Sequence, residues 1–290
     1  MGKIARAISE DGCIVSSALV STDIVSEIER IHKTSAVATA ALGRLATAAG
    51  LIGYTLKNKE DSVTIRVDGG GPLGKLIAVA DGNGHLKADV QNKICEIPLK
   101  SNGHLDVGSA VGNNGSISVV KDLGLKEPYI GITNLVSGEI AEDIAQYFAV
   151  SEQVPTVVSL GVLVNPDLTV KAAGGFIIQL LPFTTEDDIS KLEQSIKTFP
   201  HVSKMIIDGM SAEDIAKFVL EGFNPNFLDE GEVKYHCDCS REKTAKILRS
   251  IGKKELLSLA EEQETTEVVC HFCGKKYEFD SEELIKLANE

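Results

Sequence analysis

The chain lacks tryptophan, and aromatic residues make up only 5% of its 290 positions. It also lacks a long uncharged hydrophobic run. Its most apolar stretch, residues 36–53, is built mostly of Ala, Gly and Thr and contains Arg44. This composition indicates a buried helix rather than a membrane span. Residues 1–12 contain no apolar segment of the kind that a signal peptide needs. We therefore expect a cytoplasmic protein with no membrane partner.

Positive charge is also scarce, because 29 Lys and Arg face 42 Asp and Glu, which gives a net charge of −13. This balance argues against nucleic acid as a partner. The negative charge is unevenly distributed: the net charge is −6 over residues 183–236, −4 over residues 1–182 and −3 over residues 237–290. Nearly half of the net charge thus falls in the middle segment, and we expect self-repulsion to lower the stability of that segment.

A chain of this length exceeds what one core usually takes, so two or three structural units are expected. Residues 1–182 show short alternating segments between strong turn signals, with helical segments among them. This pattern predicts an α+β domain whose sheet is mixed or antiparallel, with packed helices. The expected strands are residues 4–8, 14–20, 63–67, 76–80, 84–90, 117–121, 157–164 and 174–181, and the expected helices begin at residue 22 and span 35–57 and 138–151.

From Thr184 onward the pattern becomes helical. We interpret residues 183–236 as a helical linker module with helices ending near residues 198 and 220. Its apolar stripe is thin, so it must rely on packing against its neighbours. Residues 237–290 are expected to form a small C-terminal domain. Its predicted helices are residues 240–251, residues 253–262 and a last helix from residue 281.

Four of the six cysteines form two close pairs in that C-terminal domain: Cys237 with Cys239, and Cys270 with Cys273. Two chelating pairs of thiolates are what a closed tetrahedral Zn²⁺ site needs. The domain is too short to build a good core unaided, and a bound metal can contribute on the order of 10 kcal/mol to its folding. We therefore predict one Zn²⁺ per chain in the reduced state, held by these four cysteines.

The same cysteines leave two interpretations open. Spacing alone favours a permanently closed structural zinc module. A disulfide across one residue, as between Cys237 and Cys239, closes a small and strained ring, so it would be comparatively oxidising and labile and would make the site a switch. His236 and His271 adjoin the cysteines and are conceivable ligands, although four thiols already complete the shell. Nearby basic residues favour thiolates; they are Lys234, Arg241, Lys243, Lys275 and Lys276.

Other motif-like features carry no chemistry. Residues 69–75 fit the phosphate-loop pattern G-x-x-x-x-G-K, but Leu76 stands where Ser or Thr is needed and a strand follows instead of a helix. We therefore expect a glycine-rich turn. Cys13 and Cys95 stand alone in strand-like segments and are expected to be small buried hydrophobic residues.

Taken together, several segments resemble the redox-regulated bacterial chaperone family, heat-shock protein thirty-three, over essentially the whole chain. The cysteine pattern is specific by itself, and the other segments are specific only in combination. The segments are residues 69–74 (GGGPLG), 137–143 (SGEIAED), 147–148 (YF), 151–153 (SEQ), 174–182 (GGFIIQLLP), 237–240 (CDCS) and 270–273 (CHFC).

This resemblance implies an ATP-independent holdase of the stress response that is not an enzyme. In the reduced state Cys237, Cys239, Cys270 and Cys273 would hold Zn²⁺, and the protein would be inactive. Oxidants such as hypochlorous acid, or peroxide with heat, would release the metal and form the disulfides Cys237–Cys239 and Cys270–Cys273. The linker would then unfold, and the protein would form a homodimer and bind unfolding client proteins.

Two other functions remain open at this point. One is a constitutive zinc module in a protein-interaction protein without redox switching. The other is a disulfide oxidoreductase, but that activity usually draws on a thioredoxin-like βαβ unit beside the C-x-x-C motif, and none precedes Cys270.

Overall fold

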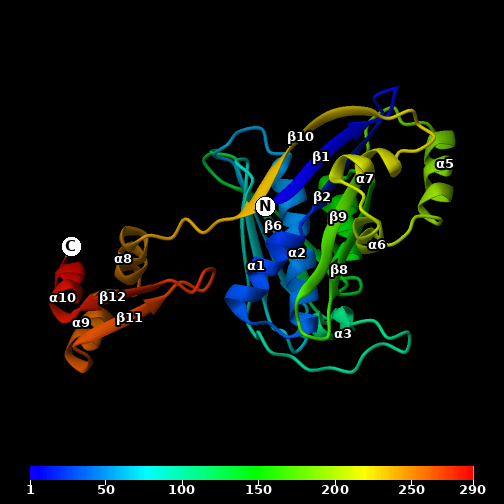
Figure 1. The fold of residues 1–290 in the computed structure, drawn as a ribbon. Coiled ribbons are helices and arrows are strands. Elements are labelled where there is room, and N and C mark those ends of the chain that lie inside the picture. The colour runs from blue at the N-terminus through cyan, green and yellow to red at the C-terminus, as the bar shows by residue number, and fades with distance from the viewer. Residues whose placement is uncertain (290) are drawn as a thin grey trace. The chain divides into compact units, whose positions relative to one another are not determined.

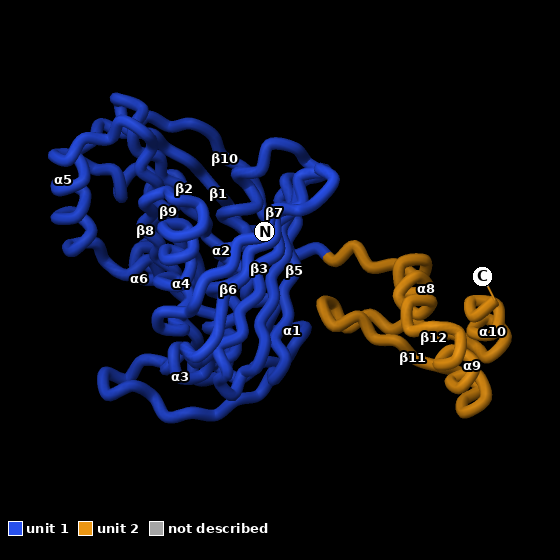
Figure 2. Tube along the Cα trace, turned by 180° about the vertical axis from the view of Figure 1, so that it is seen from behind, with its two compact units in different colours: residues 1–236 blue, residues 237–290 orange. Residues whose placement is uncertain are grey.

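The computed structural model describes residues 1–289, which fall into two compact units (Figure 2). Unit 1 is Met1–His236, and unit 2 begins at Cys237. This division falls where the sequence analysis places the start of the C-terminal domain. Residues 183–236, expected as a separate linker, pack with residues 1–182 in unit 1. The combination of a large sheet with packed helices confirms the α+β class.

Unit 1 is built on a ten-stranded sheet that is antiparallel except where its last strand meets the fifth (Figure 1). The strands are β1 (Gly2–Ile8), β2 (Ile14–Val20), β3 (Ser62–Asp68), β4 (Leu76–Asp81), β5 (His85–Val90), β6 (Ser116–Asp122), β7 (Tyr129–Asn134), β8 (Thr156–Val164), β9 (Val170–Leu180) and β10 (Asn226–Tyr235). Their order is β7-β6-β3-β4-β5-β10-β1-β2-β9-β8. Strand β10 therefore joins two halves of the sheet.

Strand β10 corrects the expectation that residues 183–236 are helical. Its sequence, NFLDEGEVKY, is rich in Asp, Glu and Gly, which are poor strand formers. Cross-strand charge explains why it pairs with β1: Glu232 lies opposite Lys3, and Asp229 lies opposite Arg6. In both pairs the side chains form an ion pair. The acidic residues of this segment are thus partly neutralised by β1 rather than left to repel one another.

The helices of unit 1 lie on both faces of the sheet (Figure 1). Helix α2 is long and apolar enough to cross a membrane, but 89% of its most apolar window is buried inside the protein, so it is a core helix. The helical segments are α1 (Thr22–His32), α2 (Ala36–Tyr54), α3 (Val107–Val111), α4 (Ala141–Tyr147), the π-helical turn η1 (Phe148–Glu152), α5 (Glu186–Ile196), α6 (Val202–Ile207) and α7 (Ala212–Phe218).

Alternation along the strands divides the apolar side chains between two cores. Leu19 and Ile177 face the core that contains α2, whereas their neighbours Ala18 and Ile178 face a second core. That second core is completed by the helices of the expected linker, which contribute Leu192, Met205, Ile215 and Val219, among others. Thus α5, α6 and α7 cover an apolar sheet face that water would otherwise reach.

The segment SGEIAED, which contributes to the family resemblance, is a structural cap at the start of α4. The fully buried carboxylate of Asp143 accepts hydrogen bonds from the backbone N–H groups of Val136 (2.7 Å) and Ile140 (3.0 Å). Burial raises the pKa of Glu139, but ion pairs with Lys100 and Arg44 outweigh burial and hold this pKa below its usual value. These contacts explain the segment without assigning it any chemistry.

The glycine-rich loop at residues 69–75 is a turn, as expected, and not a phosphate site. Its backbone N–H groups are used internally, since Gly71 donates to the carbonyl of Val111 (2.9 Å) and Leu73 to that of Ala110 (3.0 Å). A Cβ added at Gly71 would lie 2.4 Å from the carbonyl carbon of Val111, so only glycine allows this approach. The loop leads into β4, not into a helix.

Unit 2 has a small mixed fold around five buried hydrophobic side chains: Leu248, Leu256, Tyr277, Phe279 and Leu284. All three helices expected here are present, and an unexpected two-stranded hairpin accompanies them. The elements are α8 (Arg241–Ser250), α9 (Lys253–Glu262), β11 (Thr265–Val269), β12 (Lys276–Asp280) and α10 (Ser281–Asn289).

The Arg6–Asp229 pair predicts a pH-dependent attachment of β10. The hydrogen-bonded Arg6 guanidinium holds the pKa of Asp229 below its usual value, so its contribution to stability is present above pH ~4, the pKa of an unfolded Asp, and disappears as the pH falls through the lowered value. Because the pair is partly exposed to solvent, we expect Asp229→Asn to lower the free energy of unfolding by only about 1 kcal/mol at pH 7.

Chemical denaturation of the wild type and variant between pH 2.5 and pH 7 tests this expectation. The two curves should converge at the acidic end. Glu232→Gln is the matched control, because the Lys3–Glu232 pair joins the same two strands but lies in solvent. This variant should change the free energy of unfolding little. If Asp229→Asn lowers the free energy of unfolding by the same amount at every pH, the ion pair with Arg6 is not the cause.

Candidate metal centre

Two short turns position the four cysteines. Cys237 and Cys239 precede α8, whose first turn is capped by the Ser240 hydroxyl accepting from the backbone N–H of Lys243. Cys270 and Cys273 form the tip of the β11–β12 hairpin. There the N–H of Gly274 donates to the carbonyl of Cys270 (2.8 Å), and the N–H of Cys270 donates to the carbonyl of Lys275 (2.9 Å). The backbone therefore closes a tight turn that points both side chains the same way.

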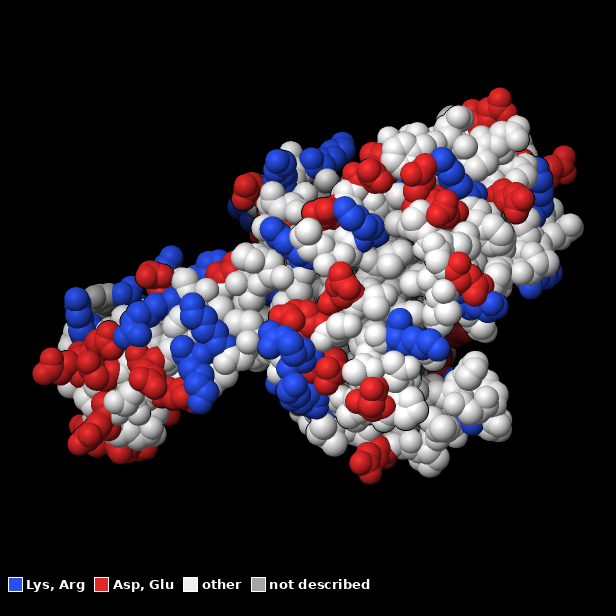
Figure 3. Space-filling view, viewed as in Figure 1, with Lys and Arg blue, Asp and Glu red and all other residues white. Residues whose placement is uncertain are grey.

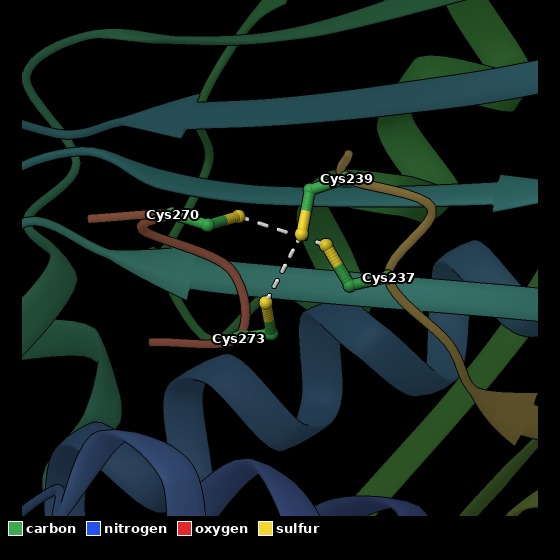
Figure 4. A group of neighbouring side chains, drawn as sticks. All are labelled: Cys237, Cys239, Cys270 and Cys273. Carbon is green, nitrogen blue, oxygen red and sulfur yellow. Dashed lines mark hydrogen bonds between the residues drawn. The ribbon is translucent and has the colours of Figure 1, made fainter. Parts of the chain in front are cut away.

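The four sulfur atoms converge on one point (Figure 4). All lie within 4.8 Å of one another, and they include contacts of 3.6 Å between Cys237 and Cys270 and of 3.4 Å between Cys239 and Cys273. A tetrahedron with Zn–S bonds of about 2.3 Å has S–S edges of about 3.8 Å. The geometry and the all-thiol donor set therefore fit a zinc ion, and no sulfur is in a disulfide.

The thiols differ in how readily they lose a proton. Burial raises the pKa of Cys237 and that of Cys273. Burial also opposes ionisation of Cys239, but hydrogen bonds to its sulfur, chiefly from the Tyr277 hydroxyl, hold its pKa below the usual value. Cys239 is thus the thiol whose surroundings favour the thiolate, which is the form that binds metal.

Tyr277 is the functional neighbour that sequence reasoning missed. Its hydroxyl lies 3.1 Å from the sulfur of Cys239, although it sits on β12, beside the other cysteine pair. The only sequence signal was its place four residues after Cys273 on a strand that was not predicted. Three of the five basic residues that the sequence analysis favoured form ion pairs with carboxylates: Lys243 with Asp238, Arg241 with Glu283 and Lys276 with Glu267.

Neither adjoining histidine belongs to the sulfur cluster among residues 1–289. The His236 ring lies against that of His85, with centroids 4.4 Å apart, and its backbone N–H donates to Leu86 in unit 1. The His271 ring packs on Phe272. Cys95 is buried as expected, whereas Cys13 is only partly buried.

Comparison with known proteins identifies the family of the chain. The family model described as Hsp33 protein matches residues 2–280. The chain belongs to the Hsp33 family.

Curated relatives of this Hsp33 family chain cover almost its full length. The 33 kDa chaperonin of Clostridioides difficile (strain 630) is 46% identical over 287 residues, which are 99% of this chain and 98% of the relative. That of Alkaliphilus metalliredigens is 45% identical over 288 residues, 99% of each chain. The crystal structure of the 33 kDa chaperonin from Thermotoga maritima is 37% identical, with a TM-score of 0.90 over 99% of this chain and 97% of that one. These names describe chaperones, not enzymes.

Removing one sulfur should weaken the centre strongly. We expect Cys239→Ser to lower zinc affinity by more than the roughly 10- to 100-fold that loss of an outer partner of a metal ligand costs. Competition between the reduced protein and a chromophoric zinc chelator measures this affinity. Cys13→Ser, in unit 1, is the control and should match the wild type. Equal affinities for the two variants would rule out Cys239 as a ligand.

Proposed function

We propose that this Hsp33 family protein is an ATP-independent holdase chaperone that oxidation of its four clustered cysteines switches on. The observation that carries the proposal is the convergence of four free thiols, within 4.8 Å, in a unit with a very small core. Family membership and the chaperone names of the relatives support the chaperone activity itself. The constitutive zinc module stays as the alternative.

In the reduced state Cys237, Cys239, Cys270 and Cys273 would together hold one Zn²⁺. When bound, the ion supplies a closed cross-link between the turn before α8 and the β11–β12 hairpin. Five buried hydrophobic side chains give unit 2 little stability of their own. The folded state of unit 2 therefore depends on the four sulfurs remaining thiolates.

Oxidation converts the thiolates that would hold the ion into disulfides. Within each pair, two thiolates lose one electron each and form one S–S bond. With protons taken from solvent, the two electrons reduce hypochlorous acid to chloride and water, or peroxide to water. The expected disulfides join Cys237 to Cys239 and Cys270 to Cys273. Sulfur contacts of 3.6 Å and 3.4 Å cross between the pairs, 237 with 270 and 239 with 273. A disulfide needs an S–S bond of about 2.0 Å and takes two thiolates from the metal, so disulfides within the pairs require the centre to come apart.

The response is located in residues 183–236. Helices α5 to α7 cover an apolar face of the sheet, to which Ile14, Phe176 and Ile178 contribute. The helices are short and depend on this packing. Their undocking would expose both the sheet face and their own apolar stripes, a surface of the kind that binds unfolding proteins. Acidic side chains stand beside uncharged areas on the face of unit 1 in Figure 3, and this charge would keep a complex with a client in solution.

Partner and location follow from the same proposal. The clients are unfolded or unfolding proteins, and the oxidised form is a homodimer. The protein acts in the cytoplasm, where reduced thiols are the resting state. Nucleic acid and membranes are not partners.

Oxidation should release zinc and create holdase activity together. We expect reduced protein to leave aggregation of a chemically denatured client unchanged, and protein treated with hypochlorous acid to suppress it without nucleotide. Chelator absorbance reports the zinc, and light scattering reports the aggregation. Cys13→Ser should behave as the wild type. If oxidised, zinc-free protein does not change client aggregation, the switch is wrong and the constitutive module is favoured.

Loosening the linker helices should bypass the switch. Ile215 of α7 is fully buried against the sheet, and Ile215→Ala should cost about 2–5 kcal/mol of local packing. We expect faster proteolysis within residues 183–225 and partial holdase activity in the reduced, zinc-bound protein. Ile207→Ala is the matched control, because Ile207 in α6 is 45% exposed. Equal protease sensitivity of the two variants would contradict the role of linker docking.

A further inference from the structure

The Tyr277 hydroxyl connects the two halves of the sulfur cluster. Tyr277 lies on β12, which follows Cys270 and Cys273, yet its oxygen is 3.1 Å from the sulfur of Cys239 in the other pair. When all four cysteines are thiolates, Cys239 has no proton to offer, so the phenol must donate and the sulfur must accept. The hydrogen bond is therefore charge-assisted.

Packing fixes the position of this hydroxyl. Tyr277 is only 6% exposed and lies in the core of unit 2 with Phe279, which is on the same face of β12. The Lys275 ammonium lies over the ring, 5.3 Å from its centroid. Pairing with Val268 across the hairpin sets the register of the residue. The phenol thus approaches the sulfur in a preset orientation.

We propose that Tyr277 is a positioning residue that orients the Cys239 thiolate, strengthens its binding of zinc and slows its oxidation. This inference rests on the proposed function, since it concerns the same cysteines. A donated hydrogen bond draws negative charge away from the sulfur and makes it a weaker nucleophile. The same bond favours the thiolate over the thiol and holds it in the ligand geometry, as the outer partners of metal ligands do.

The oxidation step that Tyr277 slows is defined. With peroxide, the Cys239 thiolate attacks one oxygen, an S–O bond forms, the O–O bond breaks, and hydroxide leaves. The Cys237 thiolate then attacks the new sulfenic sulfur, which forms the S–S bond and expels a second hydroxide. Solvent protons convert both hydroxides to water. The phenol keeps its proton throughout and acts only through the charge and position of the Cys239 sulfur.

Tyr277→Phe isolates the hydroxyl, because the ring and its packing are kept. We expect about tenfold weaker zinc binding, measured by chelator competition, at the lower end of the effect of such outer partners. Zinc release by a fixed peroxide concentration should be several-fold faster. In the cobalt-substituted protein, the sulfur-to-cobalt charge-transfer band should move to longer wavelength, because a thiolate without the hydrogen bond gives up an electron more easily.

Phe279→Leu is the matched control, since it weakens the same strand and core but leaves the hydroxyl in place. It should lower the thermal stability of unit 2 and leave the cobalt band where the wild type has it. If Tyr277→Phe also leaves the band unchanged and alters zinc release only as much as Phe279→Leu does, Tyr277 is a packing residue and the inference is overturned.

The two levels of the proposal fail in different ways. Wild-type protein that keeps its zinc under peroxide would refute the switch itself. A wild type that releases zinc, together with a Tyr277→Phe variant that matches it in affinity, release rate and cobalt spectrum, would refute only the role of Tyr277.

Discussion

The meeting of four sulfur atoms at one point is the constraint on which unit 2 depends. The cysteines come from segments about thirty residues apart, and the hydrophobic cluster that joins those segments contains only five buried side chains. A core of that size does not fix a fold by itself. On the proposed function, the fold is fixed by an ion held by Cys237, Cys239, Cys270 and Cys273, whose sulfurs lie within 4.8 Å of one another. Chemistry that changes the charge or bonding of these sulfurs would then act directly on the stability of the whole unit.

Because the chain runs directly from β10 into unit 2, loss of structure in unit 2 can affect unit 1. Cys237 follows His236, which comes directly after β10 and whose backbone N–H donates to the carbonyl of Leu86 in β5. Strand β10 lies between β5 and β1 and is the connection between the two halves of the sheet. It pairs with β1 over most of its length but with β5 at only two positions, Lys234 and Tyr235. The weaker of its two attachments is therefore the one nearest to the cysteines. On the proposed mechanism, disorder that spreads backward from Cys237 reaches that attachment first and the helices α5 to α7 afterwards.

The sequence predicted what periodicity and spacing encode, and it missed what depends on partners distant in the chain. The buried helix over residues 36–53 was predicted correctly, because its small Ala and Gly side chains allow close packing on a sheet. The cysteine pairs were informative because chelate spacing is local. Strand β10 was missed because its Asp and Glu residues disfavour a strand until Lys3 and Arg6 lie opposite them. The hairpin of β11 and β12 was missed because its charged outer positions hide the alternation of Thr266, Tyr277 and Phe279. Tyr277 was missed with it, since a hydrogen bond to Cys239 spans 38 residues.

The arrangement of contacts around the sulfurs also determines which way the centre can respond. Two sulfur contacts, of 3.6 Å and 3.4 Å, join members of the first pair to members of the second, and the Tyr277 hydroxyl adds a third connection between the pairs. These connections all draw the two turns together. On the proposed mechanism, disulfides within the pairs would shorten each S–S distance to about 2.0 Å and remove the thiolates that could hold a shared ion. Folding of unit 2 and oxidation within the pairs thus compete for the same four atoms. A unit held by so few other interactions can keep one arrangement only by giving up the other.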